Sequence, residues 1–385
     1  MKNLMTHKRT KAVQADIGTD KNYKAVSPPL YLSSTYAFHG FEEMGQYDYG
    51  RSGNPNRDAL GKAVAELEGG AGGIVTSSGM AAIDLVTNLL SADELILAPH
   101  DCYGGTHRLL THRQRQGRFR TLFVDQTDPK ALADAIEQKP SIILNETPSN
   151  PLMRLVDIAA ICKAAKKIGA LVAVDNTFLS PARQLPLSLG ADFVIHSTTK
   201  YLNGHSDVVG GCIVAKTEEH TEQLAWWANC TGVTGSPFDS FMTLRGMRTL
   251  HARMDMAESN AMALAKFLSE HKSIDHVYYP GLKSDIGYDL MKKQQSGPGA
   301  MLSFEVKGGR EAAKAVLENT ALFQLAESLG GVESLICHPG TMTHRGMEPE
   351  ARQIAGIKDT LIRISVGLED INDLTTDLKD AISNI

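Results

Sequence analysis

The chain has 385 residues, of which 42% are hydrophobic and 22% charged, and its formal net charge is -5 at pH 7. This composition is ordinary for a globular enzyme of about two domains, and it gives no indication of nucleic-acid binding. The five cysteines show no CxxC spacing and the histidines form no HExxH pair, so we expect neither a disulfide framework nor a metal site. No run of about 18 apolar residues and no signal-peptide core occur, so we expect a cytoplasmic protein with no membrane partner.

Residues 1–60 are rich in Ser, Pro, Tyr and Gly, as in the stretches SPPLYLSSTYAF and YDYGRSGNPNRD. Such a segment cannot form a core of its own. Its aromatic residues argue against disorder, which is the alternative interpretation. We therefore expect an irregular N-terminal arm that packs on another part of the protein, such as a neighbouring subunit.

Apolar runs alternate with helical stretches between residues 61 and 245. We expect strands at 73–78, 94–100, 120–126, 141–147, 171–177, 191–197 and 210–216, and helices at 79–90, 128–138 and 157–169. The strands are continuous runs of Val, Ile and Leu, which is typical of strands buried on both faces. The pattern predicts an α/β domain with a mainly parallel sheet covered by helices.

The pattern changes near residue 245. Longer helical stretches at 259–271 and 311–319 accompany shorter apolar runs at 300–306 and 360–367. We therefore predict an arm over 1–60, a large domain over 61–245 and a smaller α+β domain over 246–385.

Polar residues at the carboxyl ends of the predicted strands are the candidates for chemistry, because open α/β sheets bind ligands there. The stretch Ser78–Met80 opens a helix, whose backbone N–H groups could bind a phosphate. Tyr103 could stack on a flat ligand, and Asn150 could hydrogen-bond one. Taken singly, these residues also fit plainer interpretations, which are an ordinary tight turn, a tyrosine that packs on the domain surface and a turn cap.

The last two strand ends carry a carboxylate and an amine. Asp175 ends an apolar strand, where it needs either solvent or a partner such as a cationic ring nitrogen. Lys200 follows the next strand, with Ser197 and Thr199 beside it, and an amine among such groups suits a Schiff base. A phosphate cradle, a stacking ring, a carboxylate and an amine together are what pyridoxal 5'-phosphate requires.

The stretch HSTTKYLNGHSDVVGG resembles the lysine motif of the Cys/Met-metabolism family of pyridoxal-phosphate enzymes. The resemblance continues in order through YGRSGNPNRDAL, SSGMAAI, APHDCYGGTHRL, ETPSNPL, VDNTFLSP, ESLGGVESL and LIRISVGLED. It implies the fold type I (aspartate-aminotransferase-like) architecture and a homotetramer of two active dimers. Two segments, 224–250 and 301–344, look most like the bacterial cystathionine γ-synthase branch of the family.

The resemblance implies a role for each candidate residue. Lys200 is the Schiff-base lysine, Tyr103 stacks on the cofactor ring and Asp175 pairs with its nitrogen. The phosphate is held by Gly79, Met80, Ser197 and Thr199, and by Tyr49 and Arg51 from the arm of the neighbouring subunit. The substrates are held by Asn150, Arg363 and Ser328 at the α-carboxylate, by Arg108 at a distal carboxylate and by Glu327 at an amino group.

The implied reaction is γ-replacement, in which O-succinylhomoserine and L-cysteine give L-cystathionine and succinate. Lys200 would move the protons, and Tyr103 would act as a base toward the incoming amine or thiol. Close bacterial γ-synthases can carry a second arginine where this chain has Ser52, so O-acetylhomoserine remains an alternative substrate. Asn56 also replaces the more usual threonine of the GNPTR motif.

Three other functions deserve comparison. A lyase that cleaves cystathionine at its γ or β carbon would share almost every residue above, because small pocket differences choose the outcome. A nicotinamide-dependent dehydrogenase is disfavoured because no GxGxxG occurs. An inactive scaffold is disfavoured because Lys200, Asp175 and Arg363 are all present.

Overall fold

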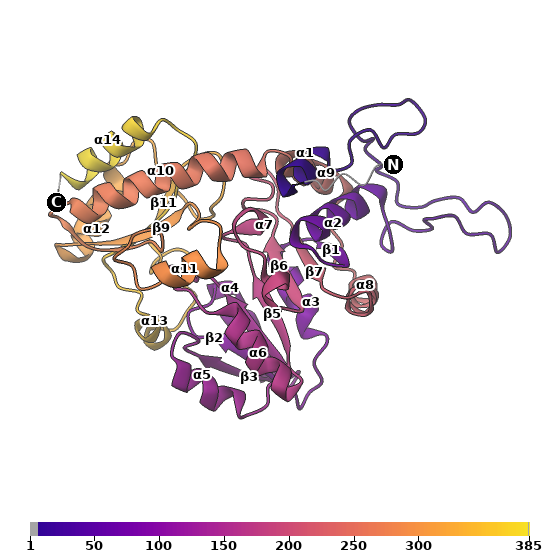
Figure 1. Ribbon diagram of the computed structural model, residues 1–385, viewed down its shortest axis with the longest axis horizontal. Helices are drawn as coiled ribbons and strands as arrows, with labels where there is room; N and C mark the ends of the chain where they lie inside the picture. Colours follow the sequence, from indigo (N-terminus) through magenta and orange to yellow (C-terminus); the bar gives the residue numbers. More distant parts are fainter. Residues whose placement is uncertain (1–6, 384) are drawn as a thin grey trace.

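The computed structural model describes residues 7–383 and residue 385 (Figure 1). Over this part of the chain the larger sheet has seven strands in the order β1-β7-β6-β5-β4-β2-β3. Their bounds are β1 Gly72–Thr76, β2 Leu95–Pro99, β3 Arg120–Val124, β4 Ile142–Glu146, β5 Leu171–Asp175, β6 Phe193–Ser197 and β7 Gly211–Ala215. Strand β7 runs antiparallel to both neighbours and the other pairs are parallel, which agrees with a mainly parallel sheet.

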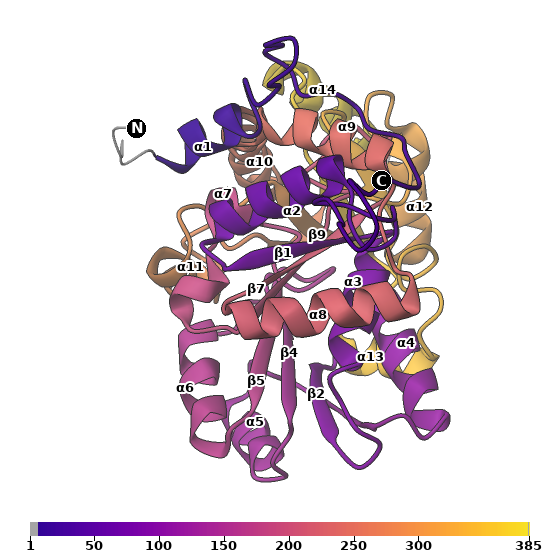
Figure 2. The ribbon, with the colours of Figure 1, turned by 90° about the vertical axis from the view of Figure 1, so that its right-hand side faces the viewer.

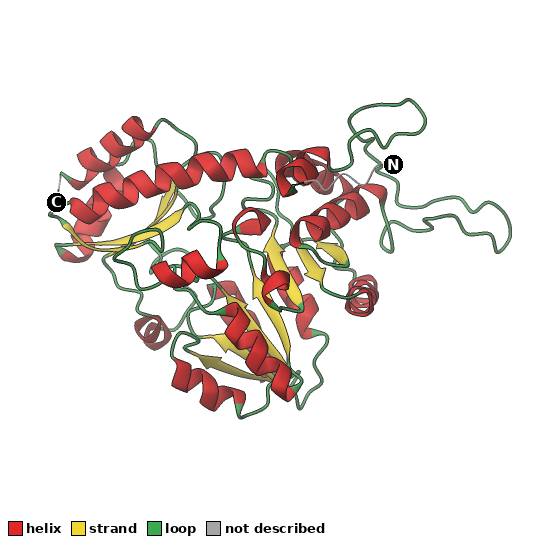
Figure 3. Ribbon diagram, viewed as in Figure 1, coloured by secondary structure: helices red, strands yellow, loops and turns green. Residues whose placement is uncertain are grey.

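Helices cover both faces of this sheet, as Figure 3 shows. Val172 and Val174 of β5 face a core shared with α6, whereas Ala173 faces a second core shared with α3. Each buried valine contributes roughly 1.5–3 kcal/mol, which explains why the strands are apolar on both sides. The helices of this region are α3 Gly79–Thr87, α4 Gly104–Arg115, α5 Pro129–Ile136, α6 Ile158–Ile168, α7 Ser180–Arg183, α8 Glu218–Thr231 and the 3₁₀ turn Pro186–Leu189.

Local signals in the sequence set the helix ends. The Asp128 side chain accepts hydrogen bonds from the N–H groups of Lys130 and Ala131, which caps α5 as predicted. Helix α6 ends at Gly169, whose φ of 75° lies in the left-handed region that glycine adopts readily.

A second sheet lies in the C-terminal part, and in the described residues it has five strands in the order β10-β11-β12-β9-β8. These strands are β8 Ile274–Tyr278, β9 Met301–Val306, β10 Gln324–Leu325, β11 Leu335–Cys337 and β12 Leu361–Ser365. Helices α10 Leu250–Glu270 and α12 Gly309–Asn319 pack on this sheet, and α14 Ile371–Ile382 packs on both of them (Figure 1). The other helices after residue 236 are α9 Pro237–Met247, α11 Tyr288–Gln294 and α13 Pro349–Ala355. Among the described helices, none has both the length and the apolar character that crossing a bilayer would need.

The expectation that residues 1–60 are irregular throughout is wrong at both ends. Helix α1 spans Lys8–Gln14, and α2 spans Pro55–Glu68 and packs on α9 and β1 (Figure 2). The reason for the early start of α2 is Asn54, whose side chain accepts from the N–H groups of Asn56 and Arg57. Between the two helices the chain forms extended loops that project from the body in Figure 1.

Candidate active site

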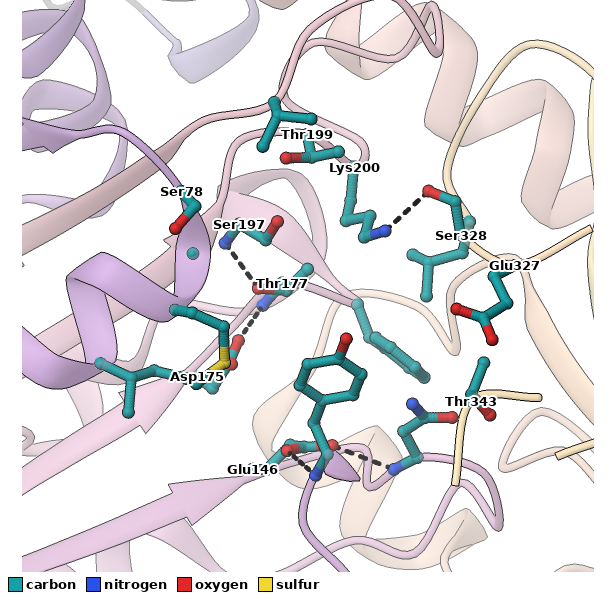
Figure 4. Close-up of a pocket in the computed structure, with 18 of the residues that line it drawn as sticks. Ser78, Glu146, Asp175, Thr177, Ser197, Thr199, Lys200, Glu327, Ser328 and Thr343 are labelled. Atoms are coloured by element: carbon teal, nitrogen blue, oxygen red, sulfur yellow. Dashed lines mark hydrogen bonds between the residues drawn. The ribbon is translucent and has the colours of Figure 1, made fainter. Parts of the chain in front are cut away.

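A cavity of about 390 Å³ lies where the strands of the larger sheet end and the C-terminal part meets them (Figure 4). This volume is within the usual range for small-molecule sites. Its walls are formed by Ser78, Gly79, Met80, Ile83, Tyr103, Glu146, Pro148, Asn150, Asp175, Thr177, Phe178, Ser197, Thr199, Lys200, Val209, Glu327, Ser328, Leu329, Thr343 and Arg363. Eleven of the residues predicted from the sequence therefore meet in one place.

One end of the cavity is suited to a phosphate. Ser78 caps α3 by accepting a hydrogen bond from Ala81 at 3.1 Å, so the N–H groups at the helix start lie at the cavity wall. A Cβ on Gly79 would lie 2.7 Å from the Cβ of Ser197, so only glycine lets the helix approach the end of β6 this closely. Thr199 is fixed by Gly210, whose N–H donates to its Oγ1 at 3.0 Å. Helix N–H groups and two hydroxyls thus line one wall, as a phosphate group requires.

Asp175 ends β5 at the cavity wall and is suited to a cationic ring. Burial raises the pKa of its carboxyl. Hydrogen bonds from Thr177, and the positive charge of nearby His196, lower the pKa in part. The N–H of Thr177 donates to Oδ1 at 3.0 Å. A protonated ring nitrogen beside this carboxylate would offset the cost of burying its charge. Tyr103 is 40% exposed and lies at the start of α4, on another wall of the cavity.

Lys200 is an amine with an altered acidity. Its Nζ donates to the Oγ of Ser328 at 2.6 Å (Figure 4). Burial, and secondarily the positive charge of Arg363, lower the pKa of Lys200 to about 8, while Glu327 opposes them. A large fraction of this amine is therefore neutral near pH 8, which agrees with the depressed pKa expected from the sequence.

Arg363 of β12 offers a guanidinium to a carboxylate. The residue is 2% exposed, and its Nη atoms donate to Oδ1 of Asn150 at 2.8 Å and to the backbone oxygen of Ser328 at 2.9 Å. Its Nε is buried and has no hydrogen-bond partner among the described residues. His344 holds Asn150 in turn, because its Nε2 lies 3.0 Å from the Asn150 backbone oxygen. The arrangement places a fixed cation beside the Lys200 amine.

Three predicted residues do not line this cavity. Tyr49 is half exposed, and Arg51 donates to the backbone oxygen of Asn229 at 2.7 Å. Arg108 is exposed on α4, with its Nη1 3.6 Å from the position that a Cβ on Gly346 would take. The roles of Tyr49, Arg51 and Arg108 stay predictions.

Sequence reasoning missed Glu146, Thr177, Phe178 and Thr343, which also line the cavity. A signal for Glu146 was available, because it is a carboxylate that ends an apolar strand, as Asp175 is. No comparable signal marks Thr343, which follows no strand of the larger sheet.

Comparisons with known proteins agree with this geometry. The family described as "Cys/Met metabolism PLP-dependent enzyme" matches residues 9–383. Cystathionine gamma-synthase of Escherichia coli (strain K12) is 54% identical over 378 residues, which are 98% of each chain. Cystathionine beta-lyase of Lactococcus lactis subsp. cremoris (strain MG1363) is 45% identical over 98% of this chain and 99% of its own.

A solved structure gives the same picture. The crystal structure of cystathionine gamma synthase from Xanthomonas oryzae pv. oryzae in complex with cystathionine is 54% identical, covers 98% of both chains and has a TM-score of 0.97. The predicted fold, a mainly parallel sheet with a smaller C-terminal part, is confirmed. The chain belongs to the Cys/Met metabolism family of PLP-dependent enzymes, and pyridoxal phosphate is its cofactor.

Proposed function

We propose that this chain is a cystathionine γ-synthase that joins O-succinylhomoserine and L-cysteine. The observation that carries the proposal is the 54% identity, over 98% of both chains, to an enzyme of that name. In this reaction the cysteine sulfur bonds to Cγ of the homoserine part, and the bond from Cγ to the ester oxygen breaks. The thiol proton leaves with the succinate, so that atoms and charges balance.

The cofactor's task is to withdraw electrons from the bound amino acid, which makes its α and β protons acidic. Within the chain, Asp175 keeps the proton on the ring nitrogen. Lys200 takes the α-proton and then moves a proton from Cβ, which lets the γ-substituent leave, and both proton transfers reverse after the thiol has added at Cγ. Gly79, Met80, Ser197 and Thr199 bind the phosphate.

The substrate's α-carboxylate is held by the Arg363 guanidinium, with Asn150 fixing that guanidinium from one side. Tyr103 receives the proton of the incoming thiol, and Glu327 holds the amino group of the cysteine. Arg108 binds the distal carboxylate of the succinyl group. The Ser52 hydroxyl donates to Asp48 at 2.6 Å within the arm itself, and a hydroxyl, unlike the arginine of close γ-synthases, brings no positive charge to the succinyl carboxylate.

We further propose a cytoplasmic homotetramer of two dimers, in which Tyr49 and Arg51 reach the phosphate of the neighbouring subunit. The apolar surface of the arm supports this: Tyr23 is 90% and Phe41 93% exposed in the single chain. Val209, which lines the cavity, is 65% exposed, so a second subunit would close the cavity there. The proposed division of the chain is an arm over 1–60, a large domain over 61–245 and a small domain over 246–385.

A product assay tests the proposed function. The protein loaded with pyridoxal phosphate is incubated with O-succinylhomoserine and cysteine, or with cystathionine alone, and products are identified by mass spectrometry. Cystathionine and succinate from the first mixture, with little turnover in the second, are expected. Pyruvate or 2-oxobutyrate from the second mixture, with no cystathionine from the first, would establish a lyase instead.

A third mixture with O-acetylhomoserine tests the role of Arg108. The wild type is expected to prefer the succinyl ester, and Arg108→Ala is expected to lose that preference, because only the succinyl ester carries a distal carboxylate. An unchanged preference in the variant would remove Arg108 from the substrate site.

A further inference from the structure

Glu146 is a buried carboxylate at the cavity that the reaction described above does not use. It ends β4, is 8% exposed and lies in register with Asp175, which ends the neighbouring strand β5. Both carboxylates line the cavity (Figure 4). Burying two carboxylates side by side is costly, so a physical reason for the second one is needed.

Both oxygens of Glu146 are engaged by backbone N–H groups. Oε2 accepts from the N–H of Tyr103 at 2.8 Å, and Oε1 accepts from the N–H of Asn150 at 3.1 Å (Figure 4). Tyr103 follows β2 and Asn150 follows β4, so the two donors belong to different loops. One of them precedes Glu146 by 43 positions and the other follows it by 4.

We propose that Glu146 is a positioning residue that fixes the loop of Tyr103 relative to the loop of Asn150. It thereby keeps a constant distance between the Tyr103 ring, which contacts the cofactor, and Asn150, which acts at the substrate's α-carboxylate. This inference rests on the proposed function only for the identity of the ligand. The positioning itself follows from two hydrogen bonds that join separate loops at a shared wall.

The electrostatics show why the hydrogen bonds matter. Burial, and secondarily the neighbouring Asp175, raise the pKa of the Glu146 carboxyl well above its ordinary value, and the two N–H groups offset this only in part. Each N–H group stabilises the ionised form, in which both oxygens can accept. A positive ring nitrogen beside Asp175 would act in the same direction.

Asp285 offers a matched comparison, because it too accepts two backbone N–H groups. Its donors are Tyr279 at 3.0 Å and Gly287 at 2.7 Å, and burial raises the pKa of its carboxyl as well. These donors lie in one short segment, so Asp285 closes a single loop away from the cavity. It represents what a half-buried carboxylate does when its hydrogen bonds hold a single loop.

The test compares Glu146→Gln with Asp285→Asn, both in the full chain with pyridoxal phosphate. An amide has only one accepting oxygen, so one backbone N–H loses its partner in each variant. In Glu146→Gln we expect faster hydrogen exchange at the Tyr103 or Asn150 amide and a changed visible circular dichroism band of the bound cofactor. We also expect KM for O-succinylhomoserine to rise about 10-fold and kcat/KM to fall about 100-fold, since such losses follow displacements of about 1 Å. Asp285→Asn should change none of these.

Unchanged exchange, circular dichroism and KM in Glu146→Gln, with a loss of Tm equal to that of Asp285→Asn, would overturn the proposal. If Glu146→Gln does not fold, Glu146→Asp retains the charge but is one methylene too short to reach both donors, and the same readouts apply. Failure of both Glu146 variants to fold, while Asp285→Asn folds, would also count against positioning. Exchange and circular dichroism need no substrate, so they stand even if the product assay refutes the γ-synthase.

Discussion

The cavity wall and the N-terminal arm place their predicted residues in different ways. Lys200 and Asp175 follow strands buried on both faces, so their positions are fixed within one chain. Tyr49 and Arg51 lie in loops whose apolar side chains, such as Phe41, remain exposed. The first set needs only the fold, whereas the second needs a partner to acquire its proposed role. The comparison separates what one subunit can do from what an assembly adds.

Removing the Lys200 amine gives the strongest test of the claim that the cavity-wall residues are placed within one chain. Lys200→Ala is expected to lower kcat about 1000-fold, because general acid–base catalysis by one side chain contributes a factor of about this size. The exposed Lys283→Ala is the matched control and should retain full turnover. Steady-state kinetics check both variants, and full turnover in Lys200→Ala would exclude the proposed mechanism.

Arg363→Lys tests whether geometry, beyond charge, holds the substrate. Lysine keeps the positive charge but cannot donate to Asn150 and Ser328 at once while binding a carboxylate at two points. We expect kcat/KM to fall about 100-fold, mainly through KM, which corresponds to about 2.7 kcal/mol. The exposed Arg310→Lys serves as the control. An unchanged KM in Arg363→Lys would place the α-carboxylate elsewhere.

Subunit mixing tests the arm. Arg51→Ala and Lys200→Ala are each expected to be weak, but a co-refolded equal mixture should recover about a quarter of wild-type activity if Arg51 serves the neighbouring site. In a mixed dimer one site then combines an intact Arg51 with an intact Lys200. Recovery no greater than the sum of the two variants would mean that Arg51 acts within its own chain or not at all.

The pH dependence of stability gives the last test, in which the expected change per pH unit is small. The pKa of Lys200 is about 8 in the folded apoprotein against 10.5 for the ordinary side chain. Between these values the unfolded chain binds more protons, so this group makes the folded state more stable as pH rises, by at most about 1.4 kcal/mol per pH unit. Lys200→Met should remove that slope. Urea unfolding of both apoproteins from pH 8 to 10.5 measures the difference, and parallel slopes would contradict the lowered pKa.

Much of the larger sheet could be predicted from sequence because its strands are uninterrupted apolar runs. The end of β5 at Asp175 and the cap of α5 at Asp128 follow from such local signals. The start of α10 at Leu250 lay outside the predicted range 259–271, because polar residues such as His251 and Asp255 hide the apolar face of its first turns.

The candidate site was predictable only in part, because its members come from distant parts of the chain. Local signals marked Lys200, but only family resemblance linked it to Arg363, 163 positions later in the sequence and on the other sheet. The end of an apolar strand marked the Glu146 carboxylate, but its proposed positioning role could not be predicted, because that role depends on the N–H of Tyr103, which lies 43 positions away. Contacts of this kind are set by the sheet order and leave no local pattern.

Borohydride reduction of the protein loaded with pyridoxal phosphate, followed by peptide mass spectrometry, tests most directly whether this cavity is the cofactor site. A stable cofactor adduct on the peptide that contains Lys200, and its absence in Lys200→Ala, is the predicted result. An adduct on any other lysine, or an undiminished adduct in Lys200→Ala, would contradict the assignment of the site.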